Sequence, residues 1–547
     1  MGPHLMRGIT TTVARAATAT VAALAVFGLA ACGGGSSQSD DAGPPVSGGT
    51  LRYGLSDAPT CSDPAQSATN QTIYVTRQIV DSLTDQVPGS GDLKPWLAQS
   101  WEVSPDAKTF TFHLKPDVTF SNGTPLTADS VKKNFDAIVT TLGGAKAPLA
   151  ATYLSGYTGT TVVDPLTARV EFSAPNAQFL QATSTPQLGI QADATVAATP
   201  EQRCQGTNIG SGPFVYSAWQ QGRSAALRKR TGYQWGSAVF THTGDAYLDG
   251  IDFTVVPESG VRTGSLGSGQ LDVISDALPN DKAQISSAGG KVLTAVNPGV
   301  PFGLQPNVSR GVLADEQVRT ALLPAINRTE LVDTVLDKDF HPATGVLAAN
   351  TPGFHAETAA LAFDAAKSRQ LLDAAGWRPG ADGIRVKDGR RLSFSVLYSP
   401  VFAGNQAILE LVQQQLKNVG VDMALDVVPA AEATVRQNSG DYDAIYYNVT
   451  RADGDILRTQ FGLTTRNLNR RGPIPALDTA LAQQQSTTDT AARNADLATA
   501  QTQIIEHGLF LPTIELSQAI GTAGTAHQVS FDASARLQFH DTWLSGR

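Results

Sequence analysis

The stretch LAQSWEVSPDAKTFTFHLKPDVTFSNGTPLTADSVKKNF, residues 97–135, decides the fold prediction. Within it, apolar and polar residues alternate over 110–114, the period of a half-buried strand. Ser-Pro-Asp at 104–106 and Asn-Gly at 122–123 are turn signals on either side of that strand. Thr127 can then cap a helix. The pattern therefore predicts strand, turn, strand, turn and helix, a small α+β module.

The same stretch resembles a known signature, that of the family 5 extracytoplasmic solute-binding proteins, the peptide, dipeptide and nickel binders of ABC importers. Further blocks of that family follow in the same order: GSGPF at 210–214, GQLDV at 269–273, NVSRGVLADEQVRTALLPAINRTELVDTVL at 307–336 and GDYDA at 440–444. No single block is decisive, but their ordered series covers nearly all of residues 49–547.

The resemblance implies an α/β fold of the two-lobed, periplasmic-binding-protein type, class II, with an inserted subdomain in the first lobe. A chain of 547 residues is too long for one core, which agrees with this division. The expected domains are a signal peptide at 1–31, a lipidated flexible tether at 32–48, lobe 1 at 49–90, 207–300 and 513–547, the inserted subdomain at 91–206, and lobe 2 at 301–512.

The composition is that of an ordinary soluble globular protein, 41% hydrophobic and 16% charged. The formal net charge of −9 argues against nucleic acid as a partner. No sequence feature indicates a cofactor, and a monomer is expected.

The N-terminus reads as an export signal, because two arginines precede a short apolar run in residues 1–31. That run ends in Leu-Ala-Ala before Cys32, which resembles the bacterial lipobox, so a lipid on Cys32 would anchor the protein outside the cell membrane. The alternative is ordinary cleavage with Cys32 incidental. The following Gly/Ser/Asp/Pro-rich residues have no apolar period and are expected to be a tether.

The other two cysteines are Cys61 and Cys204. In an exported protein such a pair suggests a disulfide, and two separate free thiols are the alternative. No CxxC or Cys/His cluster occurs, and His113 and His242 lack neighbours at ligand spacing, so no metal site is expected.

The ligand site is expected after the strand that ends near Tyr447. Peptide-binding members of the family carry a Trp and an Asp there, and the Asp pairs with the ligand's ammonium group. This chain reads YYNVTRADGD at 446–455, without the Trp, and Asp453 lies one place beyond the family's acid. Asp453 could hold an ammonium group or cap the next turn. Arg451 could grip a ligand carboxylate or join the two lobes in a salt bridge.

Further candidates are aromatic or polar residues that could line the cleft. Each also has a structural interpretation. The tyrosines could pack in the core, the asparagine could hydrogen-bond to backbone groups, and the aspartate could cap a turn. They are Asp57, Tyr74, Tyr398, Tyr446, Tyr447 and Asn448.

These observations predict a lipid-anchored receptor that captures an oligopeptide or peptide-like solute and delivers it to the permease subunits of an ABC importer, with no catalysis of its own. A binder of nickel or a metal chelate is the alternative within the family. An exported hydrolase is an alternative of another class, although neither Gly-x-Ser-x-Gly nor His-Glu-x-x-His occurs. A ligand sensor that acts on a membrane signalling protein is the third alternative.

Overall fold

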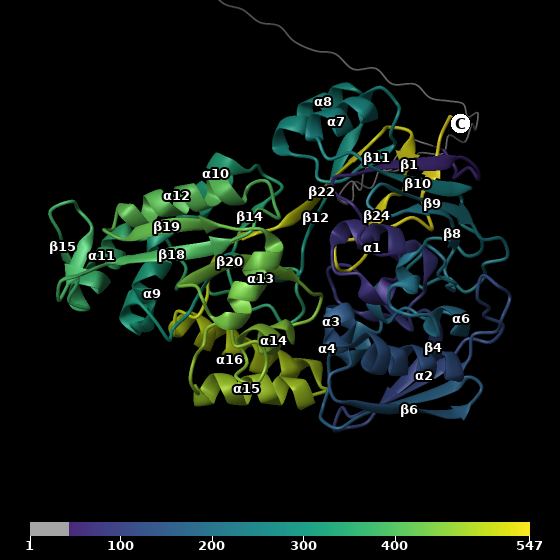
Figure 1. The fold of residues 1–547 in the computed structure, drawn as a ribbon, viewed down its shortest axis with the longest axis horizontal. Coiled ribbons are helices and arrows are strands. Elements are labelled where there is room, and N and C mark those ends of the chain that lie inside the picture. The colour runs from purple at the N-terminus through teal and green to yellow at the C-terminus, as the bar shows by residue number, and fades with distance from the viewer. Residues whose placement is uncertain (1–42, 547) are drawn as a thin grey trace, which may run out of the picture. The chain divides into compact units, whose positions relative to one another are not determined.

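The computed structural model describes residues 43–546, so the predicted signal peptide, Cys32 and most of the tether lie outside the described residues. Two large sheets organise these residues (Figure 1). No helix between residues 43 and 546 is long and apolar enough to cross a membrane.

The first sheet has seven strands in the order β12-β22-β11-β1-β10-β9-β8 and forms lobe 1. Its central strand β1 pairs in parallel with both β10 and β11, whereas β22 enters antiparallel from the far end of the chain. The strands are β1 Thr50–Leu55, β8 Phe214–Gln220, β9 Ser224–Lys229, β10 Gly250–Val255, β11 Val273–Ile274, β12 Lys291–Val296 and β22 Ser517–Thr522. Helices α1 Asn70–Thr76, α7 Ser259–Gly267 and α8 Lys282–Ser287 belong to this lobe.

The second sheet has six strands in the order β14-β21-β13-β20-β18-β19 and forms lobe 2. They are β13 Gly299–Pro306, β14 His341–Pro342, β18 Ser393–Tyr398, β19 Asp422–Val427, β20 Ala444–Thr450 and β21 Leu511–Glu515. The helices of lobe 2 are α9 Glu316–Leu322, α10 Arg328–Val335, α11 Ala365–Ala374, α12 Asn405–Lys417, α13 Ala430–Ser439, α14 Ile456–Phe461, α15 Pro475–Ser486 and α16 Thr490–Glu506. The sequence over 392–428 predicts strand, helix and strand, and the structure confirms this unit, because β18 and β19 pair in parallel and α12 connects them.

Residues 98–172, which contain the predicted strand–turn–helix module, form a separate four-stranded sheet in the order β4-β5-β7-β6. Its strands are β4 Ala98–Val103, β5 Thr109–Leu114, β6 Tyr157–Asp164 and β7 Thr167–Phe172, and α2 Ala128–Ala137 contacts β6 and β7. The side chains of β5 are alternately buried, and Thr127 and Ser130 form a capping box on α2, as the sequence predicts. Apolar side chains from these strands and from α5 Phe179–Ala182 share one core.

The two lobes are joined where the chain passes from β12 to β13 and from β21 to β22. Both connections are short, at Asn297–Pro298 and at Leu516, and the Asn297 amide donates to the Leu516 carbonyl at 2.8 Å. Two adjacent, hydrogen-bonded crossings of this kind are the construction expected of a hinge between lobes.

Apolar residues recur at helical spacing over 71–83, which predicts one helix there, but the observed α-helix is shorter. The α-helix ends at Thr76, a 3-10 turn covers Arg77–Ile79, and Val80 is extended. The reason is tertiary: the segment at Gly210–Gly212 passes so close to this turn that a Cβ on Gly212 would lie 2.5 Å from the Ile79 carbonyl carbon.

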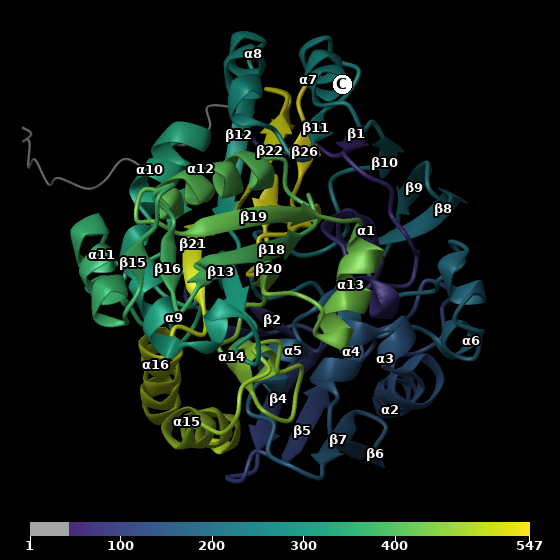
Figure 2. The ribbon, with the colours of Figure 1, turned by 60° about the vertical axis from the view of Figure 1, so that its left-hand side comes forward.

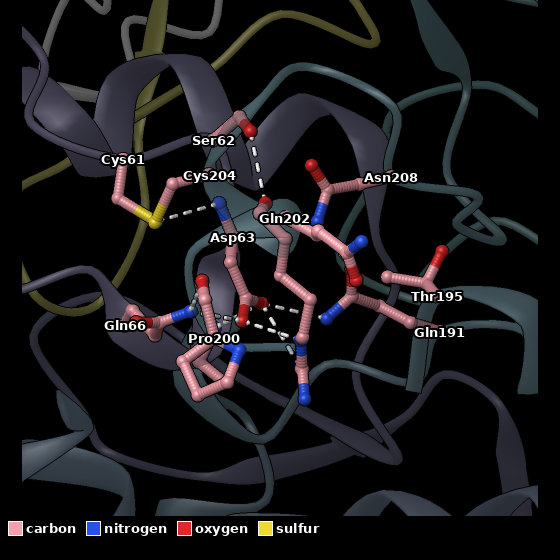
Figure 3. A network of polar contacts seen from close by, with 12 residues as sticks. Cys61, Ser62, Asp63, Gln66, Gln191, Thr195, Pro200, Gln202, Cys204 and Asn208 are labelled. Carbon is pink, nitrogen blue, oxygen red and sulfur yellow. Dashed lines mark hydrogen bonds and ion pairs between the residues drawn. A yellow bond between two sulfur atoms is a disulfide. The ribbon is translucent and has the colours of Figure 1, made fainter. Parts of the chain in front are cut away.

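Cys61 and Cys204 form a disulfide with 4.5 Å between their Cα atoms (Figure 3). Beside it, the buried Asp63 pairs with Arg203, whose Nε lies 2.7 Å from the Asp63 Oδ2. Gln191 also donates to Asp63, at 2.8 Å. The disulfide and this polar cluster therefore fasten the loop after β1 to the segment that returns from the inserted subdomain.

Candidate functional site

A narrow hollow lies where the two lobes meet. Its volume is about 20 Å³, the room of about one water molecule. Lobe 2 contributes Thr450, the last residue of β20, and lobe 1 contributes the rest of the lining. That lining comprises Asp85, Gln86, Leu149, Tyr153, Ser184, Thr185, Pro186, Gln187, Asp532, Ala533, Ser534 and Arg536. Figure 2 shows β2 (Thr84–Gln86), α4 (Pro148–Tyr153) and α5 of lobe 1 near α14 of lobe 2.

The turn between β24 (Ser530–Phe531) and β25 (Leu537–Gln538) carries two opposite charges into the hollow. The Asp532 Oδ1 accepts the backbone amides of Ser534 and Arg536, at 2.8 and 2.9 Å. The Arg536 Nε donates to the Asn70 side chain at 3.2 Å. Within residues 43–546, neither charge has an oppositely charged group at ion-pair distance, so both are available to a solute.

Deeper in lobe 1 the acid Asp85 also lines the hollow. Burial raises the pKa of Asp85 to about 6, and the positive charge of Arg77 and the hydroxyl of Ser237 oppose that rise. Burial in turn lowers the pKa of Arg77, which stacks over the Trp96 ring at 4.3 Å. The hollow is therefore lined by an acid, Asp85, whose charge depends on its burial.

A larger cavity of about 430 Å³ lies between the inserted subdomain and lobe 2, and Gln86 lines it as well. Its apolar lining includes Trp101, Phe110 and Leu180. The Gln86 amide donates to the Ala452 carbonyl of lobe 2 at 3.0 Å, and so joins the two lobes between the hollow and the cavity. This volume is in the range of small-molecule sites.

A chain of hydrogen bonds runs through both crossings. Tyr74 of α1 donates to Gln518 of β22 at 3.0 Å, and Gln518 donates to Asn297 at 3.0 Å. Asn297 then donates to Thr450 at 2.8 Å. The lobe 2 residue that lines the hollow is therefore held by side chains of lobe 1 and of the hinge.

Comparison with known proteins identifies the family. The model of the bacterial extracellular solute-binding proteins, family 5 Middle, matches residues 92–463. The chain belongs to this family. The resemblance inferred from the sequence is thereby confirmed.

Individual relatives are distant. The chain is 24% identical to the nickel-binding periplasmic protein of Escherichia coli K12, over 79% of this chain and 82% of that protein. It is 25% identical to the oligopeptide-binding protein AppA of Bacillus subtilis 168, over 77% of each. Among solved structures, NikA from Brucella suis in complex with Fe(III)-EDTA aligns with a TM-score of 0.78 and 23% identity, covering 91% of this chain and all of that one. AppA from Bacillus subtilis in complex with a nonapeptide aligns with a TM-score of 0.74 and 19% identity, covering 92% and 100%. These likenesses confirm the predicted two-lobed α/β fold.

In this family 5 chain, Asp453 does not stand free for a ligand. Its two carboxylate oxygens accept from the Arg493 guanidinium at 2.6 and 2.9 Å, and Oδ1 also accepts the Asp455 amide at 2.8 Å. Asp453 is buried. The turn-capping interpretation fits, whereas a role as the ammonium partner would require breaking the pair with Arg493.

Arg451 is also buried, and it makes no salt bridge between the lobes within residues 43–546. Its guanidinium lies 4.9 Å from the centre of the Tyr153 ring and donates to Gln178 and Thr459 at 3.4 and 3.2 Å. Because Tyr153 and Gln178 belong to lobe 1 and Arg451 to lobe 2, the residue joins the lobes through a cation–π contact and a hydrogen bond.

Three of the tyrosines are corrected from cleft walls to core residues. Tyr74 packs in the core of lobe 1, while Tyr398 and Tyr446 pack in the core of lobe 2, each at most 3% exposed. Tyr74 lies on the buried helix α1, whereas Tyr398 and Tyr446 lie in buried runs of β18 and β20, two interior strands of their sheet.

The remaining candidates lie at the surface or at half depth. Tyr447 is half-buried and its hydroxyl donates to Gln305. Asn448 is half-buried on β20, and the exposed Asp57 accepts the Ala58 amide at 2.7 Å, a local turn contact. None of these three lines the hollow or the larger cavity.

Sequence reasoning missed the residues that do line the hollow. Thr450 stands one place before the predicted Arg451, but Asp85, Asp532 and Arg536 come from segments far apart in the chain. The polar turn DASAR at 532–536 was the one local signal, and it reads like any surface turn.

Proposed function

We propose that this family 5 solute-binding protein captures a zwitterionic, peptide-like solute between its lobes. The observation that carries the proposal is the pair of unpaired charges in the hollow. The Asp532 carboxylate suits an ammonium group and the Arg536 guanidinium suits a carboxylate.

The larger cavity supports a solute longer than one amino acid. It lies on the other side of Gln86 and offers apolar side chains such as Trp101 and Leu180. A peptide whose carboxyl terminus binds at Arg536 can therefore extend past Gln86 and bury a side chain in this cavity. The hollow itself is too narrow for a solute in the present arrangement of the lobes, so binding requires the hinge to open and close again.

The relatives and the N-terminal sequence support the setting of this function. Proteins named for binding oligopeptides and dipeptides are among the matches, and the family is that of extracellular solute-binding proteins. We infer that Cys32 carries a lipid that anchors the monomeric receptor to the outer face of the cell membrane. The closed, loaded form would dock on the permease subunits of an ABC importer, and no catalytic step is required of this chain.

Isothermal titration calorimetry with tripeptides to hexapeptides, free amino acids and nickel–histidine chelates tests the proposal. We expect peptides to bind, and Arg536→Gln to weaken peptides with a free carboxyl terminus at least about tenfold while affecting amidated peptides less. Arg228→Gln, which removes an exposed guanidinium of β9 paired with Asp252, is the matched control.

Two outcomes would contradict the proposal. Binding of the nickel chelate alone would favour the metal-chelate alternative, which the match to a nickel-binding periplasmic protein makes the second candidate. Equal loss of affinity for free and amidated peptides in Arg536→Gln would remove this guanidinium from carboxylate recognition.

A further inference from the structure

Two histidines and an aspartate from segments far apart in the chain meet in lobe 1. The Nδ1 atoms of His242 and His540 each lie 2.8 Å from the Asp541 Oδ1. The other oxygen of Asp541 accepts the Thr241 amide at 2.7 Å. One potential metal-ligand atom from each of His242, His540 and Asp541 lies within 4.8 Å of the other two. Spacing along the sequence does not show this cluster, because His242 stands far before His540 and Asp541 in the chain.

The ring nitrogens of both histidines face acceptors on both sides. The His540 Nε2 lies 2.9 Å from the Gly244 carbonyl, and the His242 Nε2 lies 3.1 Å from the Asp245 carbonyl. A neutral imidazole carries one proton, and donation to these carbonyls places it on Nε2. The His540 Nδ1 meets the Asp541 Oδ1 in hydrogen-bond geometry, whereas the His242 Nδ1 faces the same oxygen without a hydrogen bond.

The two rings stack on each other, with their centroids 4.2 Å apart and 18° between the planes. The His242 Nδ1 is moreover buried and makes no hydrogen bond, since its 2.8 Å approach to Asp541 has poor angular geometry. It is a buried ring nitrogen that faces the cluster without a hydrogen-bond partner.

We propose that His242, His540 and Asp541 bind a divalent transition metal ion. Two imidazole nitrogens and one carboxylate oxygen form a ligand set suited to Ni²⁺, Zn²⁺, Co²⁺ or Cu²⁺ rather than to Mg²⁺ or Ca²⁺. The backbone carbonyls on both Nε2 atoms are the outer partners that metal-binding histidines typically have, because they fix the tautomer that leaves Nδ1 free.

The cluster is accessible. Asp541 and Thr241 line a cavity of about 310 Å³, which offers a path for the ion and room for water ligands. Since a ring lone pair lies in the ring plane, binding requires the stacked rings to tilt apart. His242 has the freer side chain, 17% exposed against 1% for His540. The site would tie the segment after β9 to the C-terminal return of lobe 1, and its cavity shares Asp85, Gln86 and Asp532 with the hollow.

Calorimetric titration of the chelator-treated protein with NiCl₂ and ZnCl₂ tests the site, with MgCl₂ as the contrasting ion. We expect one equivalent of Ni²⁺ or Zn²⁺ to bind and Mg²⁺ not to bind. His242→Gln should lower the affinity at least about tenfold. His507→Gln is the matched control, because this half-exposed histidine also lies 2.8 Å from a carboxylate, that of Glu316, but on lobe 2.

A second measurement needs no variant. Electron paramagnetic resonance of the wild-type protein with one equivalent of Cu²⁺ should show coupling to two imidazole nitrogens. Absence of binding in the wild type would overturn the proposal. So would an affinity equal to wild type in His242→Gln, or coupling to fewer than two nitrogens.

Discussion

At the scale of single residues, charges that sequence reasoning assigned to the ligand are neutralised inside the protein. Asp453 and Arg493 are 6% and 16% exposed, and two charge-assisted hydrogen bonds join them. Burial raises the pKa of Asp453, but the charge and hydrogen bonds of Arg493 outweigh it, so the pKa lies below its usual value. The pair holds the turn after β20 against the start of α16.

Asp453→Ala is therefore expected to reduce stability and not merely ligand affinity. It leaves the buried Arg493 without its partner, and removing one member of a buried pair typically costs about 3–5 kcal/mol. Urea unfolding followed by circular dichroism measures the change. Glu201→Ala, which breaks an exposed pair with Lys146, is the control and should shift the midpoint little. Equal midpoints in the two variants would show that the Asp453 pair does not stabilise the fold.

Glu515, at the end of β21 beside the hinge, is a buried acid whose titration should be visible. Burial raises its pKa from 4.5 to about 7, and the Ala349 amide, which donates to it at 2.9 Å, opposes the rise. Between these two pH values the folded chain holds a proton that the unfolded chain has released. The stabilisation by the protonated form is therefore complete below about pH 4.5 and is lost as the pH rises to about 7.

The expected result is a free energy of unfolding that falls across this window, by on the order of 3 kcal/mol at most from this group. Glu515→Gln keeps the acceptor but cannot titrate, so the difference between wild type and variant should follow the same window. Urea unfolding at pH 5 and at pH 7.5 measures it, with Glu432→Gln on the exposed face of α13 as the control. A difference that is independent of pH would mean that Glu515 ionises normally.

At the scale of elements, the path of one strand-like segment determines where a helix ends. A Cβ on Gly212 would lie 2.5 Å from the Ile79 carbonyl carbon and 2.7 Å from the Val80 nitrogen. The Gly212 amide also donates to the Ile79 carbonyl at 3.0 Å. Both glycines of GSGPF serve close approach of two backbones, since neither has a positive φ.

Gly212→Ala should accordingly destabilise lobe 1, because two backbones would have to separate. Overpacking of this kind costs about 1–3 kcal/mol or more. Gly264→Ala is the matched control: it lies inside α7 with no atom within 4 Å of an added Cβ, and it should be neutral or stabilise by about 0.5–1 kcal/mol. Thermal and urea unfolding compare the two. A Gly212→Ala protein as stable as wild type would refute the close-approach explanation.

At the scale of the whole molecule, the two lobes contact each other beside the hollow and also at a second place, far from the hinge. The Gln485 side chain at the end of α15 donates to the Pro175 carbonyl at 2.7 Å. The Gln485 backbone carbonyl accepts the Ala177 amide at 2.9 Å. These bonds join lobe 2 to the inserted subdomain. Opening the hinge must break them, so they contribute to the closed arrangement.

Gln485→Ala is expected to shift the ligand-free protein toward the open arrangement. One hydrogen bond is worth about 0.5–1.5 kcal/mol, which changes the ratio of open to closed molecules about two- to tenfold. Small-angle X-ray scattering should report a larger radius of gyration than for wild type. Gln483→Ala, at an exposed neighbouring position, is the control. Identical scattering from Gln485→Ala and wild type would show that this contact does not hold the lobes together.

The sequence alone determined the local elements and, through their order, the family. Alternation over 110–114, the cap at Thr127 and the turn at Asn122–Gly123 are properties of neighbouring residues, and the structure confirms the strand and helix they predict. Strand pairing and the ends of elements were predicted less well from the sequence. The end of α1, for example, depends on a segment more than a hundred residues away.

Only the tertiary structure decided which polar residues stand free and which are paired. Asp453 was a candidate from the sequence, but its partner Arg493 comes from α16, a distant element of the chain. Asp532 and Arg536 became site candidates only when the C-terminal return placed their turn against Thr450. The cluster of His242 and His540 arose in the same way. Side-chain charge is available to a ligand only where folding leaves it without a partner, and partners far apart in the chain are not encoded in any local pattern.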